Sequence, residues 1–419
     1  MRSHREVEAR SLRWLPAGAS RDAAVLLQTR AMRAFGDGVV SVVLAAYLTA
    51  VGLSDVRIGT VVTLTLLGSA ALTLTVGLRA HAFPRRRLLS LVSLLMIATG
   101  IGFAAATSFW PLAIIGVVGT LNPSGGDVSV FLPTEQALLP STVPDVQRTA
   151  LFARYALGGS LVAAVGAACA GIPEWVGHRV HASTTTALRF TFVAYAVIGV
   201  MVLWRYRQLT PAVEREATTE RRALGASRSI VYRLAALFAL DAFGGGFVIT
   251  ALLVLWLQRR FHLSLATSGA VFFWTGILSA FSALIAVRIA RRIGLIRTMV
   301  FTHLPANGLL VLTAFMPSAG LAVACLLARS LLSQMDVPAR TSYVMAVVTP
   351  DERPAAASVT NVPRSLAAAL PPVAAGWMLS HSTFGWPLIL AGATKAAYDL
   401  LLLHQFRDLR PPEEVVSTR

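Results

Sequence analysis

Residues 33–53 read RAFGDGVVSVVLAAYLTAVGL, an apolar run with one arginine and one aspartate near its start. An α-helix needs about 20 consecutive apolar residues to cross the hydrocarbon core of a bilayer, and this run has that length. A charged side chain at the centre of such a helix costs about 2.5–3.5 kcal/mol on insertion scales, so it persists only where it is paired or faces water. The stretch therefore predicts a membrane-spanning helix in which Arg33 and Asp37 are paired or functional.

Comparable apolar runs recur along the whole chain. Its 419 residues are 55% hydrophobic and 14% charged, with a mean hydropathy of +0.66, whereas soluble domains contain about 25% charged residues. The runs are separated by short polar joints and predict an all-α membrane protein with twelve transmembrane helices. The expected spans are residues 30–52, 57–78, 88–107, 111–136, 148–172, 186–206, 231–257, 264–287, 298–316, 319–347, 356–380 and 386–403.

The formal net charge of +17 is unevenly distributed. If both termini are cytoplasmic, most of the arginines fall in cytoplasmic segments, which is the positive-inside pattern and predicts this orientation. A nucleic-acid-binding protein would need a basic soluble domain, and the sequence contains none, so we expect a lipid bilayer and no nucleic acid as partner.

The chain repeats itself at a shift of roughly 210 residues. The stretch FGDGVV at 35–40 aligns with FGGGFV at 243–248, and Arg154 aligns with Arg364. A parallel repeat of two six-helix halves is typical of secondary transporters, whose substrate site lies near the midplane between the halves. The expected organisation is a cytoplasmic tail (1–29), a six-helix bundle (30–206), a charged cytoplasmic linker (207–229), a second six-helix bundle (230–403) and a cytoplasmic tail (404–419).

Over nearly its whole length, the chain resembles the major facilitator superfamily. The superfamily's loop between the second and third helices has the form G-x-L-x-D-R-x-G-R-R. Residues 77–87, GLRAHAFPRRR, keep the first glycine and the terminal arginines but have His81 in place of the aspartate and Pro84 in place of the second glycine. The second-half copy, VRIARRIG at 287–294, keeps its arginines and the late glycine. The resemblance implies gating or structural charges at His81, Arg85, Arg86, Arg291 and Arg292, and the repeat predicts the same role for Arg154 and Arg364.

This resemblance implies an alternating-access secondary transporter of a small organic molecule, coupled to protons. The stretch SVTNVPRS at 358–365 is similar to prokaryotic members, which implies a bacterial cytoplasmic membrane. Helix 148–172 is rich in glycine but lacks the proline of the drug-exporter motif. Export is the expected direction, and uptake or organic-anion transport is the alternative. We expect a monomer.

Other classes of function fit the sequence less well. The chain lacks a phosphate-binding G-x-x-x-x-G-K-[ST] loop and clustered metal-ligand spacings, so no cofactor, metal or enzymatic activity is expected. A non-transporting sensor would need a soluble output domain, for which the linker and tails are short. Cys169 and Cys325 lie within expected spans and are interpreted as packing residues, as is the isolated His303.

A dozen charged residues fall inside the expected spans, six of each sign, which permits mutual neutralisation. They are Arg33, Asp37, Asp127, Glu135, Arg154, Asp241, Arg329, Asp336, Arg340, Arg364, Lys395 and Asp399. Residues four apart share a helix face, which predicts the pairs Arg33–Asp37, Asp336–Arg340 and Lys395–Asp399. The repeat predicts two further pairs, Arg154–Asp127 and Arg364–Asp336.

The first and seventh helices meet across the cavity in the fold that the resemblance implies. Arg33 takes the position of Asp241 in the repeat, so we expect Asp37, Arg33 and Asp241 to form a proton-coupling, substrate-linked group near the midplane. A buried structural network is the alternative. Residues expected to line the substrate cavity are Arg329, Asp336, Arg340, Asp127 and Trp256. Arg329 has no acid three or four residues away and would suit an anionic substrate group, although pairing with Asp127 is an equal alternative.

Overall fold

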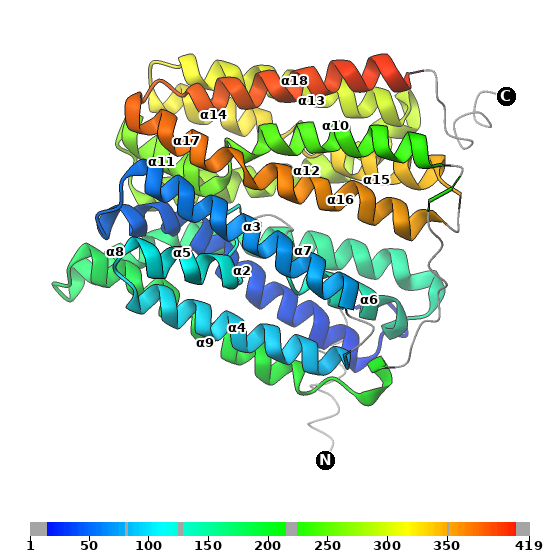
Figure 1. Ribbon diagram of the computed structural model, residues 1–419, viewed down its shortest axis with the longest axis horizontal. Coiled ribbons are helices and arrows are strands. Elements are labelled where there is room, and N and C mark those ends of the chain that lie inside the picture. Colours follow the sequence, from blue (N-terminus) through cyan, green and yellow to red (C-terminus); the bar gives the residue numbers. More distant parts are fainter. Residues whose placement is uncertain are drawn as a thin grey trace.

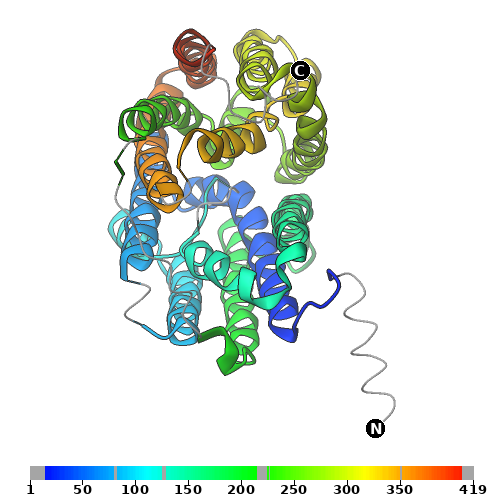
Figure 2. The ribbon, with the colours of Figure 1, turned by 90° about the vertical axis from the view of Figure 1, so that its right-hand side faces the viewer.

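The computed structural model describes residues 15–79, 83–124, 129–214, 224–225, 227–349 and 352–407. In these ranges the chain is helical and contains no strand. Its long helices run roughly side by side in two groups, an upper one and a lower one in Figure 1. The same two groups are seen end-on in Figure 2. Nine helices in the described residues are long and apolar enough to cross a membrane.

The first half of the chain forms the lower group. Its α-helices are α2 (Arg21–Ala50), α3 (Asp55–Arg79), α4 (Arg85–Ala105), α5 (Phe109–Val118), α6 (Leu132–Leu138), α7 (Arg148–Ala168), α8 (Ile172–Arg179) and α9 (Thr184–Tyr206). Short 3-10 turns cover η2 (Leu139–Thr142), η3 (Asp145–Gln147), η4 (Cys169–Gly171) and η5 (Pro211–Glu214). Helix α2 packs between α7 and α9, and it begins nine residues before the expected span.

The second half forms the upper group. Its helices are α10 (Arg228–Gly246), α11 (Thr250–Phe261), α12 (Leu265–Ile293), α13 (Leu295–Phe315), α14 (Ala319–Ser330), α15 (Asp336–Val347), α16 (Arg353–Ala369), α17 (Pro371–His381) and α18 (Trp386–Phe406). Helix α10 packs between α16 and α18, as its repeat counterpart α2 packs between α7 and α9.

Several expected spans are interrupted rather than continuous. The span expected at 111–136 ends its first helix at Val118 and resumes at Leu132. The span expected at 319–347 breaks between Ser330 and Asp336, and the span expected at 231–257 breaks between α10 and α11. The first break coincides with a run, GTLNPSGG at 119–126, of residues that disfavour helix. The first two breaks lie at corresponding positions in the two halves.

Contacts between the halves concentrate where α3 meets α17 and α7 meets α12. A Cβ atom at Gly59 would lie 2.4 Å from the carbonyl oxygen of Pro372, and one at Gly269 would lie 2.4 Å from that of Ala167. Such close backbone contact requires glycine at both repeat-related positions. Nearby, Arg259 forms a 2.7 Å ion pair with Asp55 across the interface.

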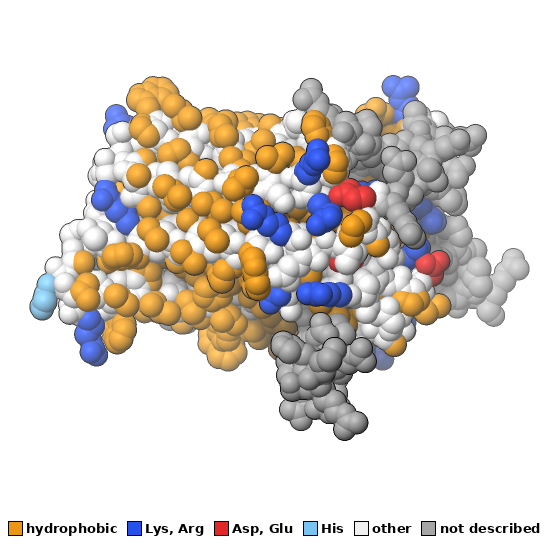
Figure 3. Space-filling model, turned by 90° about the horizontal axis from the view of Figure 1, so that it is seen from below, with side chains coloured by type: hydrophobic (Ala, Val, Ile, Leu, Met, Phe, Trp, Pro, Cys, Tyr) orange, Lys and Arg blue, Asp and Glu red, His pale blue; other side chains and the backbone are white. Residues whose placement is uncertain are grey.

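The outer surface is suited to lipid. Many large apolar side chains are exposed, among them Trp110 at 72% and Leu91 at 60%, whereas exposed apolar patches of this extent are rare on soluble monomers. On the face shown in Figure 3, hydrophobic side chains form a broad band, and arginines gather mainly toward its right-hand end. This distribution matches a belt that sits in the hydrocarbon core and is bordered by basic residues.

Candidate functional site: two buried charge clusters

The first cluster surrounds Glu135 in α6, whose side chain is fully buried. Arg33 of α2 forms an ion pair with it, and Tyr155 of α7 donates a hydrogen bond to it. Tyr206 of α9 donates a further bond at 2.5 Å, and Thr29 of α2 donates one at 3.1 Å. A buried carboxylate is tolerated when its charge is neutralised and its oxygens are hydrogen-bonded. Glu135 meets both conditions and ties four helices together.

Asp37 lies one turn beyond Arg33 on α2 and is 7% exposed. The expected Arg33–Asp37 contact is wrong, because the ion pair of Arg33 is formed with Glu135. Asp37 instead interacts electrostatically with both Arg33 and Arg30, and it lies near the hydroxyl of Tyr195.

The glycines that flank Asp37 are explained by helix packing. A Cβ at Gly38 would lie 2.0 Å from the carbonyl oxygen of Ala163 in α7, and one at Gly36 would lie 3.1 Å from the ring of Tyr195 in α9. These glycines therefore let α2 approach its two neighbours closely, and they provide no separate indication of a ligand.

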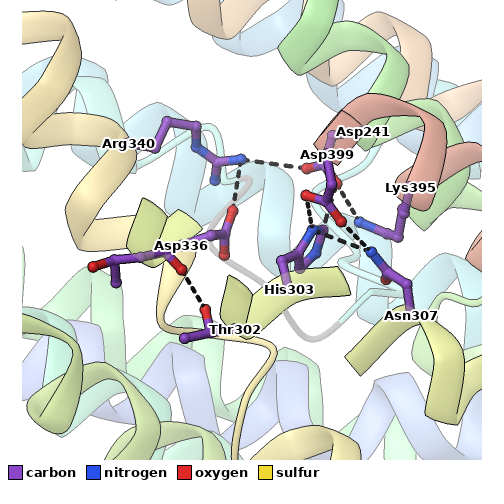
Figure 4. Close-up of polar contacts among 9 residues, drawn as sticks. Asp241, Thr302, His303, Asn307, Asp336, Arg340, Lys395 and Asp399 are labelled. Atoms are coloured by element: carbon purple, nitrogen blue, oxygen red, sulfur yellow. Dashed lines mark hydrogen bonds and ion pairs between the residues drawn. The ribbon is translucent and has the colours of Figure 1, made fainter. Parts of the chain in front are cut away.

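The second cluster is centred on Asp241 of α10 (Figure 4). Its carboxylate accepts a 2.6 Å hydrogen bond from Lys395 of α18 and contacts Arg340 of α15 at 3.3 Å. The Nε2 atom of His303 in α13 lies 3.8 Å from the same carboxylate. Arg340 also pairs with Asp336 at 3.3 Å, which confirms the pair expected from the spacing. Asp241 thus joins four helices of the second half.

Asp399 of α18 adds a second buried carboxylate to this cluster. Its side chain is fully buried and lies 2.9 Å from Nδ1 of His303. Asn307 of α13 donates a further hydrogen bond to it at 2.9 Å. The expected Lys395–Asp399 pair is wrong, because each residue has a partner on another helix. Since His303 reaches Asp241 as well, its imidazole lies between two carboxylates.

Gly244 gives the side chain of Lys395 room to reach Asp241, whereas a Cβ atom at Gly245 would be in ordinary van der Waals contact with it. A Cβ at Gly244 would lie 2.9 Å from the Cγ atom of Lys395, and one at Gly245 would lie 3.7 Å from its Nζ atom. The repeat aligns Gly245 with Asp37. The side chain of Lys395 therefore lies next to a glycine at the position where the first half has a carboxylate.

The group expected across the midplane, Asp37–Arg33–Asp241, does not form. Arg33 is engaged with α6, and Asp241 points into its own bundle toward α13, α15 and α18. The repeat alignment matched the two positions along their helices but did not show which way the side chains point, because a residue on the first or seventh helix can face the other half or its own bundle.

Arg329 and Arg364, two further predicted charges of the second half, form no ion pair within the part of the chain that the structure describes. Each is partly buried, and the Nε atom of each lacks a hydrogen-bond partner there. Both interact at longer range with Asp241 and Asp336. The expected Arg364–Asp336 pair is wrong, because Asp336 is bound by Arg340.

The other predicted site residues have varied surroundings. Trp256 is 1% exposed and donates a hydrogen bond to the carbonyl oxygen of Thr383, so it packs inside the bundle rather than lining a cavity. The backbone N–H groups of Arg85 and Arg86 donate to Glu214. Arg291 and Arg292 are exposed in the last turn of α12, where cations favour the helix dipole.

The predicted Arg154–Asp127 pair, the alternative pairing of Arg329 with Asp127 and the gating charge expected at His81 involve residues outside the described ranges. Arg154 takes part in a polar or electrostatic interaction. No group of three or more His, Cys, Asp and Glu residues that could hold a metal ion is found in the described ranges.

Sequence reasoning missed the hydrogen-bonding residues Tyr155, Tyr206 and Asn307. Each is a polar residue within an apolar span, and that pattern is the available signal, because a polar group inside a bilayer requires a partner. Spacing along one helix reveals partners on that helix alone, whereas these residues bind carboxylates from other helices.

Solved structures with this fold include transporters. A bacterial homologue of the human lysosomal transporter Spinster, in an inward-facing conformation, superposes with a TM-score of 0.68 at 16% identity over 93% of this chain and 98% of that one. The nucleoside transporter NupG gives 0.70 at 12% identity, over 93% and 100%. The human organic anion transporter MFSD10 gives 0.60 at 16% identity, over 91% and 99%.

One curated relative extends over almost the whole chain. It is an uncharacterized membrane protein of the yeast Saccharomyces cerevisiae, 24% identical over 93% of this chain and 94% of its own length. The sequence model of the Major Facilitator Superfamily matches residues 27–333 and 234–419, which together span both halves. With the helical fold and the transporter-like neighbours, this match establishes that the chain is a multi-pass membrane protein of the major facilitator superfamily.

Proposed function

We propose that this chain is a proton-coupled secondary transporter that moves a small organic molecule by alternating access. The observation that carries the proposal is the buried second-half cluster, in which the imidazole of His303 lies between Asp241 and Asp399. Ionisable groups inside a membrane are costly, and they commonly mark ion and proton pathways. The structural similarity to the nucleoside transporter NupG and the organic anion transporter MFSD10 supports a small-molecule substrate.

The proposed topology has twelve spans and cytoplasmic termini. Seven spans are single helices (α2, α3, α4, α9, α12, α13 and α18). Five are successive pairs (α5–α6, α7–α8, α10–α11, α14–α15 and α16–α17). The arginines near Arg85 and Arg291 then lie on the cytoplasmic side, as the positive-inside rule expects. The proposed location is the bacterial cytoplasmic membrane.

Proton coupling requires a group that gains a proton in one conformation and loses it in the other. Asp399 has no lysine or arginine within ion-pairing distance in the described residues, so its charge is balanced by a proton on His303 or on itself. Asp241, in contrast, is balanced by Lys395 and Arg340. A movement of α18 or α13 relative to α10 would change whether the imidazole of His303 contacts Asp241 or Asp399. The proton affinity of this cluster would change with that contact.

Asp37 is the proposed coupling residue of the first half. Its interactions with Arg33 and Arg30 stabilise the ionised carboxylate, and any movement that separates them favours protonation. The bundles would rock about contacts such as Gly59 with Pro372. In the proposed topology these contacts lie on the external side, so the structure corresponds to a chain that is closed to the outside.

Flux in proteoliposomes with an imposed pH gradient tests the proposal. Candidate substrates come from a ligand panel screened for thermal stabilisation of the purified protein. Asp399→Asn and Asp37→Asn should abolish gradient-driven transport but preserve substrate exchange at equal pH, because both imitate a permanently protonated carboxyl. The control is His381→Asn, which changes an exposed histidine in the same half as Asp399. Unchanged gradient-driven flux in both carboxyl variants would refute proton coupling through these groups.

The proposed direction is export, and uptake is the alternative. For a proton antiporter, acidification of the vesicle lumen should drive substrate into the lumen, and for a symporter it should drive substrate out. Cysteine labelling from one side establishes the orientation of the reconstituted protein and so assigns the sign to export or uptake.

A further inference from the structure

The start of α4 and the end of α9 meet at one edge of the apolar surface. These helices pack against each other and form the underside of the molecule in Figure 1, which is the side seen in Figure 3. Arg86, in the first turn of α4, places its Nη2 atom 3.4 Å from the carbonyl oxygen of Arg207, the residue directly after α9. The two helix ends therefore bring their arginines together.

Four arginines at this edge have unused hydrogen-bonding capacity. Arg87 and Arg207 are exposed, and Arg86 and Arg205 are half-buried. The Nε atoms of Arg86 and Arg205 are shielded from solvent and have no hydrogen-bond partner among the described residues. Arg205 contacts the side-chain oxygen of Gln208 at 3.3 Å, and Arg86 contacts a backbone carbonyl. These neutral partners leave the charges of the guanidinium groups unpaired.

The carboxylates near the same edge are engaged elsewhere. Both oxygens of Glu214 accept hydrogen bonds from the backbone N–H groups of Arg85 and Arg86, at 2.8 and 3.0 Å. Asp22 accepts from the backbone N–H and from the hydroxyl of Thr210, at 2.9 and 2.6 Å. Neither acid forms an ion pair with a guanidinium group within the described ranges.

Positive charge is in excess at this edge. The described positions 85–87, 205 and 207 supply five arginines, against the two carboxylates just described. The segments 1–14 and 215–223 lie outside the described residues, and each contains more arginines than acids. Acids in these segments are therefore too few to neutralise the edge.

The exposed arginines continue two lipid-facing stripes of side chains. On α4 the exposed residues include Arg87, Leu91 and Leu94, and on α9 Trp204 precedes Arg207 by three residues. Residues three or four apart share one face of a helix. Each stripe therefore leads from the apolar belt to an arginine about one helical turn, roughly 5 Å, beyond it.

We propose that this edge binds an anionic phospholipid, with its phosphate at Arg86, Arg87 and Arg207 and its acyl chains along the two stripes. Guanidinium groups match phosphate oxygens in geometry and charge. The exposed apolar side chains beside the arginines favour a lipid over free phosphate. Clustered arginines next to membrane-spanning helices attract the anionic lipids of the cytoplasmic leaflet, and the proposed topology places this edge on that side. Binding of the lipid is independent of the transport proposed above.

Trp204 provides a probe at the edge. Its side chain is 59% exposed, and its ring centroid lies 5.0 Å from the guanidinium carbon of Arg205. Tryptophan is enriched at membrane boundaries, where its ring reaches lipid. Brominated acyl chains that lie along α9 should therefore quench its fluorescence.

The full chain is reconstituted in phosphatidylcholine vesicles that contain increasing fractions of dibrominated phosphatidylglycerol or dibrominated phosphatidylcholine. The quenching that is absent in Trp204→Phe gives the relative affinity of this edge for the two lipids. The ratio is compared among the wild type, Arg87→Gln/Arg207→Gln and Arg87→Lys/Arg207→Lys, after gel filtration has selected folded protein. Arg179→Gln is the matched control, because Arg179 also lies on an exposed tryptophan, 4.9 Å from the ring of Trp175, but at the opposite end of α9.

We expect the wild type to prefer phosphatidylglycerol, and each arginine replaced by glutamine to lower the preference about fivefold, the scale for one arginine near an anionic surface. The lysine variant should keep most of the preference, and Arg179→Gln all of it. Equal affinity for the two lipids, an unchanged preference in the glutamine variant, or an equal loss in Arg179→Gln overturns the proposal. Inorganic phosphate is compared with chloride at equal ionic strength. A preference lost in phosphate alone assigns the edge to free phosphate and overturns the lipid site, whereas a retained preference supports it.

Discussion

Replacing Glu135 with glutamine should strongly destabilise the first half of the chain, because it removes the partner of a buried cation. Arg33 is 1% exposed and pairs with Glu135. Its remaining contacts would be a 3.1 Å hydrogen bond to Ser129 and the ring of Phe131, whose centroid lies 4.1 Å from its guanidinium carbon. These contacts supply no negative charge, and Asp37, the carboxylate one turn away, forms no ion pair with Arg33 and also interacts with Arg30. Removal of one partner from a buried ion pair typically costs about 3–5 kcal/mol.

Glutamine is the informative substitution because it isolates the charge. Its side-chain oxygen can still accept from Tyr206 or Tyr155, so the loss reported by Glu135→Gln is mainly electrostatic. In the double variant Arg33→Met/Glu135→Gln both charges are absent, and the variant should be more stable than Glu135→Gln alone by about 2 kcal/mol.

Thermal unfolding of the purified full chain, followed by tryptophan fluorescence, measures the effect. A bundle of this size loses about 2–4 °C in Tm per kcal/mol, so Glu135→Gln should unfold on the order of 10 °C lower. Glu214→Gln is the matched control. That carboxylate accepts from the backbone of Arg85 and Arg86 near the aqueous boundary and should cost about 1 kcal/mol. A shift under about 2 °C for Glu135→Gln, or a double variant less stable than Glu135→Gln, would refute the reasoning.

Two further predictions concern the second half and the interface. Lys395→Met should lower Tm by several degrees because Asp241 loses its 2.6 Å partner, whereas Lys395→Arg should lose less because the charge remains; equal Tm values for the two variants would contradict this role of the charge. Gly59→Leu should hold the halves apart, because its Cβ would lie 2.4 Å from the carbonyl oxygen of Pro372. In a background free of native cysteines, Val373→Cys should then react faster with a hydrophilic maleimide, and an unchanged rate would show that the contact adapts.

Hydropathy predicted the spans well where a helix is continuous. The runs 57–78, 88–107, 186–206 and 298–316 lie within α3, α4, α9 and α13 or extend beyond them by at most two residues. The interruptions were missed for two different reasons. The run 119–126 carries glycines and a proline whose effect on the helix was visible in the sequence, whereas the five residues 331–335 contain neither. The signal of the second break lies after it: Pro338 in the first turn of α15 has no N–H to bond the carbonyl of residue 334, and hydropathy does not report this.

Pairing of the buried charges was predictable only within a helix. Asp336 and Arg340 pair as their spacing indicates. Lys395 and Asp399 have the same spacing but do not pair with each other. Lys395 binds Asp241 and Asp399 binds His303, both of which lie on other helices. Spacing of four residues establishes that two side chains share a face, but the neighbouring helix on that face decides which partner each one takes.

The two halves use the same architecture with opposite charge polarity and different titration chemistry. In the first half, the cation lies on the first helix, Arg33, and the anion on the fourth, Glu135; in the second half, the anion lies on the seventh, Asp241, and the cation on the tenth, Arg340. The donors to Glu135 are arginine, tyrosine and threonine, which hold their protons throughout the physiological range. The second half adds histidine, the side chain that ordinarily titrates near neutral pH. If the chain couples transport to protons as proposed, the Glu135 cluster is suited to remain fixed, and the moving protons belong with Asp37 in the first half and with Asp399 and His303 in the second.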